Sequence, residues 1–313
     1  MASHQNFQPC AFTPGNSTKQ SYLPLKIATW NVRTLNTGEN GVDKGDQLSS
    51  DLERYGIDLC CISEVRRPGS GISAVGKSWH LAYSGSRMGL RKYGVGIMMS
   101  TYAKRSLLDT QFLSDRVMKA VFKWGRIKVH VVAVYAPNDD KQQDKKGKFY
   151  DELQHLIDAI PVRDQLIVAG DFNAQLGGLQ REIWGDALGP HTLGNKVTDN
   201  GLKLMALCAS NELVVRNTFF QQKDIHLATW VGPTGCLLAQ IDHILIRRRD
   251  AKFISNCKVM RGANLESDHR LLRAHCAFPG STMYKGHFNT PKINLNLLMQ
   301  NLGIQRQFEQ LIK

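Results

Sequence analysis

Short apolar runs, rich in β-branched residues, recur along the chain between turn signals and polar stretches. Because polar residues seldom alternate with apolar ones inside these runs, the runs are typical of strands that are covered on both faces. They predict strands at 26–30, 57–63, 95–100, 120–124, 127–135, 166–170, 212–216 and 240–246. Glycines in the segments 89–96 and 123–125 indicate hairpin connections.

Helical periodicity appears between these runs, at 47–55, 146–160 and 200–211. In the second of these segments Phe149, Leu153 and Leu156 recur at helical spacing, and Pro161 ends the pattern. Helices interleaved with strands predict an α/β protein, with two packed sheets as the simplest layering. We find no internal repeat.

The same pattern divides the chain into three parts. Residues 1–24 are rich in Ser, Gln, Asn and Pro, which predicts a disordered N-terminal segment. Residues 25–279 hold all the strand and helix signals and predict one folded domain. Residues 280–313 form a polar C-terminal tail in which Leu297, Leu298 and Leu302 allow one helix.

Composition narrows the class of partner. Of 313 residues 40 are basic and 27 are acidic, and a net charge of +13 favours a phosphate-rich partner. No apolar run approaches 18 residues and the N-terminus lacks a secretory pattern, so we expect an intracellular, nuclear protein without a membrane span. Seven cysteines without a C-x-x-C pair indicate reduced thiols rather than disulfides or a zinc site.

Polar residues close several predicted strands, where a scaffold can aim them into a cleft. Asn31 offers an oxygen to a hard cation and an NH₂ group to a phosphate, although for this residue taken alone a cap or an Asx-turn is the favoured explanation. Glu64 follows an apolar run and is costly to bury unpaired. Either a Mg²⁺ ion or a salt bridge to Arg66 or Arg67 would justify it.

Two further strands end in polar groups. Tyr135 closes a long strand before Pro137, and its hydroxyl is either a phosphate donor or the wet tip of a half-buried aromatic. In the string Gly170-Asp171-Phe172-Asn173 a carboxylate and an amide lie two residues apart, which suits water activation and phosphate clamping. The glycine would permit close approach of a ligand, and an ordinary Gly-Asp turn is the alternative.

Two Asp-His pairs complete the candidate chemistry. Asp242 lies inside an apolar strand and could orient the imidazole of His269, since a buried carboxylate fixes the tautomer and favours the imidazolium. A protonated His269 could stabilise charge on a pentacovalent phosphorus. We expect His243 to be structural, because its side chain alternates away from that of Asp242.

These motifs, in this order, resemble the exonuclease–endonuclease–phosphatase superfamily over about residues 25–278. The resemblance implies a four-layer αββα sandwich of the deoxyribonuclease I-like type. Some strings are most similar to the endonuclease domains of RTE-type LINE retrotransposons and to a host protein descended from such an element. These strings are Trp30-Asn31-Val32-Arg33-Thr34-Leu35, Ser63-Glu64-Val65-Arg66 and Ser114-Asp115-Arg116-Val117-Met118.

The resemblance also implies roles for single residues. Glu64 and Asn31 would hold the metal, Mg²⁺ or in its place Mn²⁺, with Asp268 nearby. Asp171 would deprotonate the attacking water or protonate the leaving oxygen. Asp242 would orient His269, which would stabilise the transition state. The phosphate would be held by Asn173 and Tyr135, and Thr229 would add a phosphate or backbone contact.

One departure from the repair enzymes of this superfamily is informative. Their second acidic residue, two places after the Asn, is replaced by Arg33, as in the retroelement group. Basic residues at loops and strand ends would track a nucleic-acid backbone, although a solvated basic surface explains about half of them. The DNA-binding candidates are Arg33, Arg66, Arg67 and Arg116.

The leading hypothesis is a Mg²⁺-dependent DNA endonuclease of LINE-retrotransposon origin that leaves a 3′-hydroxyl. The alternative is a host-exapted, non-catalytic DNA- or chromatin-binding module with the same fold. An inositol or lipid phosphatase ranks below both, because the inositol phosphatases carry Asp-Arg where this chain has Asp242-His243. DNA is the expected partner; no small-molecule cofactor is expected, and the sequence indicates no protein partner.

Overall fold

The computed structural model describes residues 22–35, 43–178, 181–263 and 265–279. The predicted C-terminal tail, and all of the predicted N-terminal segment except its last three residues, lie outside this part. Those three residues open the first strand, which therefore begins earlier than the sequence predicts.

The described helices are α1 Lys44–Arg54, α2 Thr101–Arg105, α3 Gln143–Asp158, α4 Arg181–Trp184 and α5 Asp199–Ser210. The strands are β1 Tyr22–Asn31, β2 Leu59–Ser63, β3 Ser70–Val75, β4 Trp79–Ser84, β5 Val95–Ser100, β6 Leu107–Phe112, β7 Val117–Trp124, β8 Ile127–Tyr135, β9 Gln165–Asp171, β10 Leu213–Val215, β11 Trp230–Val231, β12 Leu238–Ala239, β13 Asp242–Arg247, β14 Ile254–Met260 and β15 Leu271–Pro279. All eight predicted strands and three predicted helices are present, with ends shifted by a few residues.

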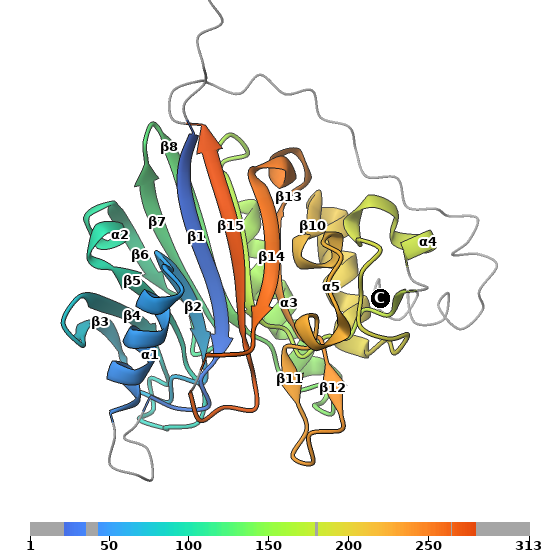
Figure 1. The fold of residues 1–313 in the computed structure, drawn as a ribbon, viewed down its shortest axis with the longest axis horizontal. Helices are drawn as coiled ribbons and strands as arrows, with labels where there is room; N and C mark the ends of the chain where they lie inside the picture. The colour runs from blue at the N-terminus through green and yellow to red at the C-terminus, as the bar shows by residue number, and fades with distance from the viewer. Residues whose placement is uncertain (1–21, 36–42, 179–180, 264, 280–313) are drawn as a thin grey trace, which may run out of the picture.

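Two sheets stand face to face (Figure 1). Over the described residues, the first has the strand order β14-β15-β1-β2-β5-β4-β3 and the second the order β10-β13-β9-β8-β7-β6. In each sheet one central pair is parallel, β1 with β2 and β8 with β9. Asn31, Tyr135 and Asp171 are the last residues of β1, β8 and β9, and Glu64 follows the end of β2.

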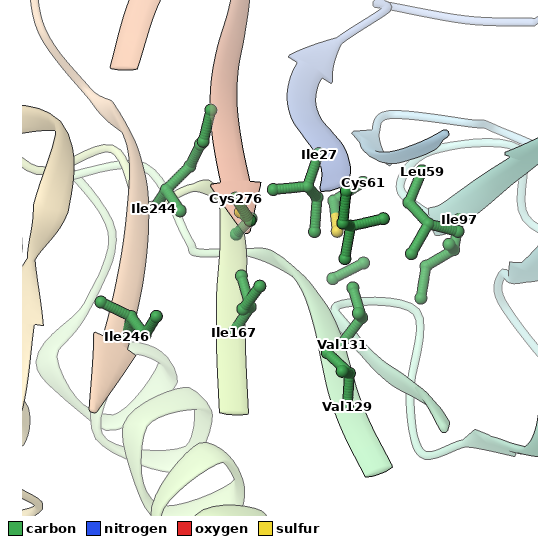
Figure 2. Packing of buried hydrophobic residues seen from close by; sticks show 14 of the residues in the cluster. Ile27, Leu59, Cys61, Ile97, Val129, Val131, Ile167, Ile244, Ile246 and Cys276 are labelled. Atoms are coloured by element: carbon green, nitrogen blue, oxygen red, sulfur yellow. The ribbon is translucent and has the colours of Figure 1, made fainter. Parts of the chain in front are cut away.

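The inner faces of both sheets form one apolar core, which Figure 2 shows from close by. Ile27 and Cys61 of the first sheet lie in the same buried cluster as Val131 and Ile167 of the second. Burying each aliphatic side chain of this kind stabilises the fold by roughly 1.5–3 kcal/mol. This core fixes the position of one sheet relative to the other, and so it sets the distance between their strand ends.

Helices cover the outer faces. Leu48 and Leu52 of α1 pack with Trp30 and Ile62 on the first sheet. On the second sheet α3 and α5 bury their apolar faces against β8 and β9. The predicted four-layer αββα sandwich is therefore confirmed, and the central strands are uninterrupted apolar runs because both of their faces are covered.

Both predicted hairpin connections are present. Trp124 pairs with Ile127 across a two-residue turn, and a longer connection joins β4 to β5. The six cysteines in the described ranges are free thiols. None of the described helices is both long and apolar enough to cross a membrane.

Candidate active site

The first half of the site lies where β1 and β2 end side by side. Asn31 is the last residue of β1 and pairs with Ser63, the last residue of β2. Glu64 follows immediately and turns out of the sheet with a φ of 57°. The parallel pairing thus delivers an amide and a carboxylate to one edge of the first sheet.

The second half comes from the other sheet by the same logic. Tyr135 and Asp171 end the parallel strands β8 and β9 and are partners in register. Asp242, the first residue of the antiparallel strand β13, lies opposite Asp171. Because the two sheets are packed face to face, the polar groups of both sheets meet in one cleft.

That cleft has a volume of about 680 Å³. It is lined by nine of the thirteen predicted site residues, although these are spread over almost the whole domain. Among its lining residues are Asn31, Arg33, Glu64, Arg66, Tyr135, Asp171, Asn173, Asp268 and His269.

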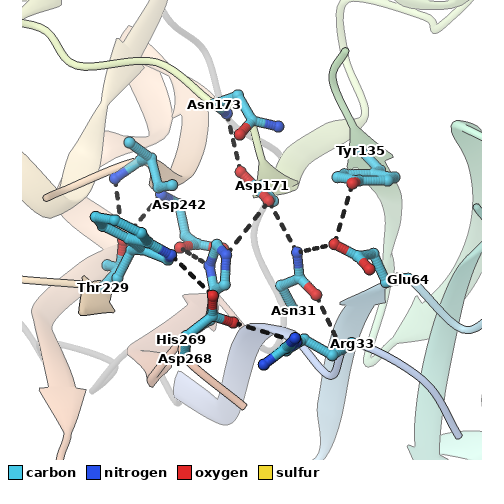
Figure 3. A network of polar contacts seen from close by, with 12 residues as sticks. Asn31, Arg33, Glu64, Tyr135, Asp171, Asn173, Thr229, Asp242, Asp268 and His269 are labelled. Carbon is cyan, nitrogen blue, oxygen red and sulfur yellow. Dashed lines mark hydrogen bonds and ion pairs between the residues drawn. The ribbon is translucent and has the colours of Figure 1, made fainter. Parts of the chain in front are cut away.

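Glu64 is the carboxylate of the first half (Figure 3). Its Oε1 accepts hydrogen bonds from Asn31 Nδ2 and from the Tyr135 hydroxyl, each at 3.0 Å. Its Oε2 accepts from Arg66 at 2.5 Å. The carboxylate is therefore held by three donors, and the salt bridge to Arg66 that the sequence left open is present together with the contacts expected of a site residue.

Asp171 is the carboxylate of the second half and is fully buried. Its Oδ2 accepts from Asn31 Nδ2 at 3.0 Å, so a single amide links the carboxylates of the two sheets. Its Oδ1 accepts from the backbone N–H of Asn173 at 2.9 Å. Burial, reinforced by the charge of Asp242, raises the pKa of Asp171 to about 7.

Asp242 and His269 form a buried pair. His269 Nδ1 lies 2.9 Å from Asp242 Oδ2, and His269 Nε2 lies 3.8 Å from Asp171 Oδ2 (Figure 3). Burial alone would lower the pKa of His269, but the charges of Asp242 and Asp171 outweigh it and raise the pKa to about 9. The imidazole is therefore a cation at neutral pH, with its second nitrogen turned toward Asp171 and the cleft.

Asp268 stands at the rim of the cleft. Its Oδ2 accepts a hydrogen bond from the Trp230 indole at 3.0 Å, and its Oδ1 lies 3.7 Å from Arg33 Nε. Arg33 therefore faces an acidic partner from the neighbouring strand end of the same sheet, because β15 pairs with β1. Where the repair enzymes are expected to carry a second acidic residue, this chain therefore has Arg33, which forms an ion pair with Asp268.

The three phosphate-binding candidates occupy different environments. Asn173 lines the cleft while its Nδ2 donates to the Ala136 carbonyl at 3.0 Å. Tyr135 also lines the cleft, and burial together with the charge of Glu64 raises its pKa, so the hydroxyl stays protonated. Thr229 is fully buried, and its hydroxyl accepts from the N–H groups of Ile241 and Asp242, so it makes the backbone contact rather than a phosphate contact.

The four arginine candidates divide in the same way. Arg33 and Arg66 line the cleft. Arg116 instead stacks on the Tyr135 ring at 5.0 Å and donates to the carbonyl of the same residue, so it supports a site residue from behind. Arg67 donates to Ser73 at 3.3 Å, away from the cleft.

Backbone strain concentrates at the site. Of the five described non-glycine residues with positive φ, four lie in or beside the cleft: Arg33, Glu64, Arg66 and Asn173. Such conformations cost of order 1–3 kcal/mol each and persist where the surroundings impose them.

The expected role of Gly170 is wrong. Its missing Cβ makes room for the neighbouring strand and not for a ligand, because a Cβ there would lie 2.0 Å from the Val134 carbonyl oxygen.

Two groups of residues offer ligands to a divalent cation. Ligand atoms of Asp171, Asp242 and His269 lie within 4.8 Å of one another. A ligating histidine must be neutral, so a cation at this group would have to displace the proton that the surrounding carboxylates favour on His269. Glu64 is the better fit, because its carboxylate oxygens line the cleft and 14% of its side chain remains exposed. Asn31 lies beside it, and its Oδ1 accepts a hydrogen bond from the Arg33 N–H at 3.0 Å.

Sequence reasoning overlooked the residues that support this arrangement. Asn200 is fully buried, and its Nδ2 donates to the Pro137 carbonyl at 2.8 Å, which fixes the loop after Tyr135. The Ser267 hydroxyl donates to the Asn31 carbonyl at 2.6 Å. The only local signal for Asn200 was its place at a helix start, where asparagine is expected as a cap.

The αββα layers and the polar cluster at the strand ends define the class of fold to which the chain belongs. The chain belongs to the Endonuclease/Exonuclease/phosphatase family, whose sequence profile matches residues 28–269. Craniofacial development protein 2 of Bos taurus is 34% identical over 248 residues, covering 79% of this chain and 40% of that protein. The Tragulus javanicus protein of the same name is 33% identical over 248 residues, covering 79% of this chain and 41% of its own. The chain therefore spans about 40% of the length of these relatives.

Solved structures agree on the fold. A 3′-5′ exonuclease (NExo) from Neisseria meningitidis has a TM-score of 0.59 and 22% identity, covering 80% of this chain and 98% of that one. The AP endonuclease LMAP from Leishmania major has a TM-score of 0.62 and 13% identity, with coverages of 82% and 88%. The endonuclease domain of TRAS1, a telomere-specific non-LTR retrotransposon, has a TM-score of 0.56 and 12% identity, with coverages of 83% and 100%. The resemblance drawn from the sequence motifs is thereby confirmed.

Proposed function

We propose that the protein is a divalent-metal-dependent DNA endonuclease that hydrolyses a phosphodiester bond and leaves a 3′-hydroxyl. The observation that carries the proposal is the Asn31 amide, which donates to Glu64 and to Asp171 at 3.0 Å each. This single group ties a candidate metal ligand to a candidate base, although the two carboxylates stand on different sheets. No simpler structural need explains two carboxylates and an imidazolium gathered in one cleft.

Each group has a role in the proposed reaction. A cation held by Glu64 and Asn31, with Asp268 at the rim, would supply positive charge to a phosphoryl oxygen. Asp171, with a pKa of about 7, accepts the proton of the attacking water. His269 donates a hydrogen bond from its charged ring to the phosphoryl oxygen on which charge develops. Asn173 and Tyr135 hold the scissile phosphate from the opposite side.

DNA is the proposed substrate, and the nucleus the proposed location. The net charge of +13 supports a polyanionic partner, and Arg33 and Arg66 bring part of that charge into the cleft. One structural neighbour is the NExo 3′ phosphatase bound to a product DNA hairpin. A LINE-retrotransposon origin is supported by the strings around Asn31 and Glu64 and by the similarity of the fold to the TRAS1 endonuclease domain.

The test is relaxation of a supercoiled plasmid in Mg²⁺, with and without a chelator. We expect nicking by the wild type that the chelator abolishes, and a loss of at least about 10²-fold in Asp171→Asn. Asp186→Asn is the matched control, because Asp186 lies at the opposite end of the sheets and pairs with Arg248. Plasmid that stays supercoiled with wild type, or equal nicking by Asp171→Asn, would overturn the proposal.

A second candidate function is a DNA- or chromatin-binding module without turnover. The observation that favours it is the net charge, which is sufficient by itself for binding to a nucleic-acid backbone. It predicts an affinity that falls steeply with salt, and no nicking in either Mg²⁺ or Mn²⁺. The plasmid assay and a salt titration of binding, carried out on one preparation, separate the two functions.

A further inference from the structure

The connection between β4 and β5 ends in an unusual tip. Its six residues Arg87–Lys92, termed the 87–92 tip below, are all exposed. Met88 is 87% exposed and Leu90 is 59% exposed, although both are large apolar side chains. Between them Gly89 has a φ of 76° and no heavy atom within 4 Å of the position of its missing Cβ. The tip therefore holds two apolar side chains out in solvent on a tight turn.

The base of this tip is hydrogen-bonded to the segment that carries Glu64 and Arg66, two residues that line the cleft. Val65 and Arg66 donate their backbone N–H groups to the carbonyls of Gly94 and Tyr93, at 3.1 and 2.8 Å. On the other side, the Gly69 N–H donates to the Ser86 carbonyl at 3.1 Å. The tip is thus attached by both of its ends to the segment that carries Glu64 and Arg66, and a molecule bound over these residues lies beside it.

The charge around the two apolar side chains is of one sign. Arg87, Arg91 and Lys92 flank them, and the connection from Gly85 to Gly94 contains no acidic residue. Within the described part of the chain these three side chains form no ion pair with a carboxylate. The tip accordingly presents two apolar side chains surrounded by three cations, next to a cleft that is built for a phosphodiester.

We propose that the 87–92 tip is a wedge that inserts Met88 and Leu90 between base steps of duplex DNA while its cations contact the flanking phosphates. Apolar side chains bordered by basic ones unstack and kink DNA from the minor groove in this way. The kink exposes the phosphodiester backbone on the side where Glu64 and Arg66 lie. The inference rests on the proposed function for its substrate, and it assigns the tip a role in choosing flexible steps such as TA and CA.

Charge decides for DNA against the other partners that an apolar tip could bind. An apolar protein surface would gain nothing from three cations placed around the contact, since each would lose its hydration on binding. A phosphate backbone on both sides of an inserted side chain satisfies all three cations. An anionic lipid surface satisfies them too, and it is therefore an outcome that the experiment must separate.

The experiment measures binding of the full chain, in chelator, to a duplex with 2-aminopurine at a central TA step. Wild type should raise the 2-aminopurine fluorescence, because unstacking relieves its quenching. The variant M88S/L90S should lose that rise and bind about tenfold more weakly. Its slope of log Kd against log salt should match the wild type, because no cation is removed. R87Q/R91Q should instead lower the slope by about 2.

The matched control is L108S/V162S. Leu108 is 52% exposed and Val162 is 54% exposed, and both lie at the end of the sheets away from the cleft. The control should bind and unstack the duplex as the wild type does. Unchanged affinity and fluorescence in M88S/L90S would overturn the wedge. Loss of binding to phosphatidylserine vesicles by M88S/L90S, with DNA binding intact, would assign the tip to a lipid surface and overturn it as well.

The failure of this proposal is distinguishable from failure of the proposed function. If wild type nicks plasmid and M88S/L90S binds and nicks equally well, the wedge alone is wrong. If wild type unstacks the duplex and M88S/L90S does not, while neither nicks plasmid, the wedge stands and the endonuclease proposal falls.

Discussion

Replacing Asp242 by Asn removes a charge from the buried pair with His269 while keeping the size of the side chain. In the structure Asp242 is fully buried and its Oδ2 lies 2.9 Å from His269 Nδ1. Asp242 is the strongest of the three carboxylates that raise the pKa of His269 against burial. The substitution therefore acts on the protonation of one histidine and leaves the cleft surface unchanged.

The magnitude follows from the pKa of His269, which is raised from 6.5 to about 9. A difference of this size stabilises the imidazolium by about 3 kcal/mol, and most of it depends on Asp242. If the pKa returned to 6.5, the charged fraction at pH 7.5 would fall from roughly 97% to roughly 9%, about a tenfold loss. Loss of orientation adds to this, and the corresponding change in a Ser-His-Asp triad costs about 10⁴-fold in kcat. We therefore expect kcat to fall by about 10²- to 10⁴-fold, with little change in the KM for DNA.

The assay combines NMR titration of the histidine rings with nicking rates between pH 6 and 10. In wild type, activity should decline as His269 loses its proton near pH 9, and in Asp242→Asn the decline should move to lower pH. His130, which pairs with Asp164 at the far end of the sheet, is the internal reference and should titrate equally in both proteins. A His269 pKa unchanged by the substitution, or a kcat within threefold of wild type, would refute the reasoning.

Three further predictions follow from other parts of the structure. Burial lowers the pKa of His243 to about 4. As the pH falls from about 6.5 to 4, only the unfolded chain therefore takes up a proton at this residue. The free energy of unfolding should drop by about 3 kcal/mol over that window. Urea titrations should show a flatter pH dependence for His243→Gln, and an equal dependence would contradict the buried neutral ring. Arg66→Gln should tighten Mn²⁺ binding to the free protein several-fold and weaken DNA binding, because the guanidinium that competes for Glu64 is gone; calorimetry that finds Mn²⁺ binding weaker than in wild type would oppose this. Gly170→Ala should destabilise the protein by about 3 kcal/mol, because a Cβ there would meet the carbonyl of the neighbouring strand. The control Gly147→Ala lies in a helix with open space around the added Cβ, and it should stabilise the protein by about 0.5–1 kcal/mol. Equal melting temperatures for the two alanine variants would contradict the prediction, because they would show that β8 and β9 can move apart at Gly170 at little cost.

The sequence predicts the strands at the centre of the sheets best. Strands such as β8 and β9 are buried on both faces and read as uninterrupted apolar runs. The strand β3 alternates exposed and half-buried residues along an edge, and β15 interrupts its apolar residues with Arg273 and His275. These strands were not predicted, because only one of their faces is covered. The resulting mixture of polar and apolar residues cannot be distinguished from that of a polar loop.

The site could be anticipated to the extent that it lies at strand ends. Asn31, Tyr135 and Asp171 each end an apolar run, and parallel pairing brings such ends together. The hydrogen bond from Asn31 to Asp171 joins two sheets across 140 residues of sequence, and no local pattern determines it. For the same reason the sequence around Thr229 does not predict that its side chain is buried.

Side-chain direction accounts for most of the remaining differences. Arg116 lies at the strand end expected for a DNA contact, yet its guanidinium stacks on two tyrosine rings behind the site. Whether a basic residue faces the cleft or supports it depends on which aromatic neighbours the fold provides. That information lies in tertiary contacts and is absent from the motif.

The nature of the cut ends, on an end-labelled duplex incubated with Mg²⁺, tests the central claim most directly. If Glu64, Asp171 and His269 act together on one phosphodiester, wild type should leave a 3′-hydroxyl that a DNA polymerase extends at once. Asp171→Asn should leave the duplex intact, and so should wild type in chelator. Nicks that a polymerase extends only after phosphatase treatment, or nicks formed equally by Asp171→Asn, would contradict the account.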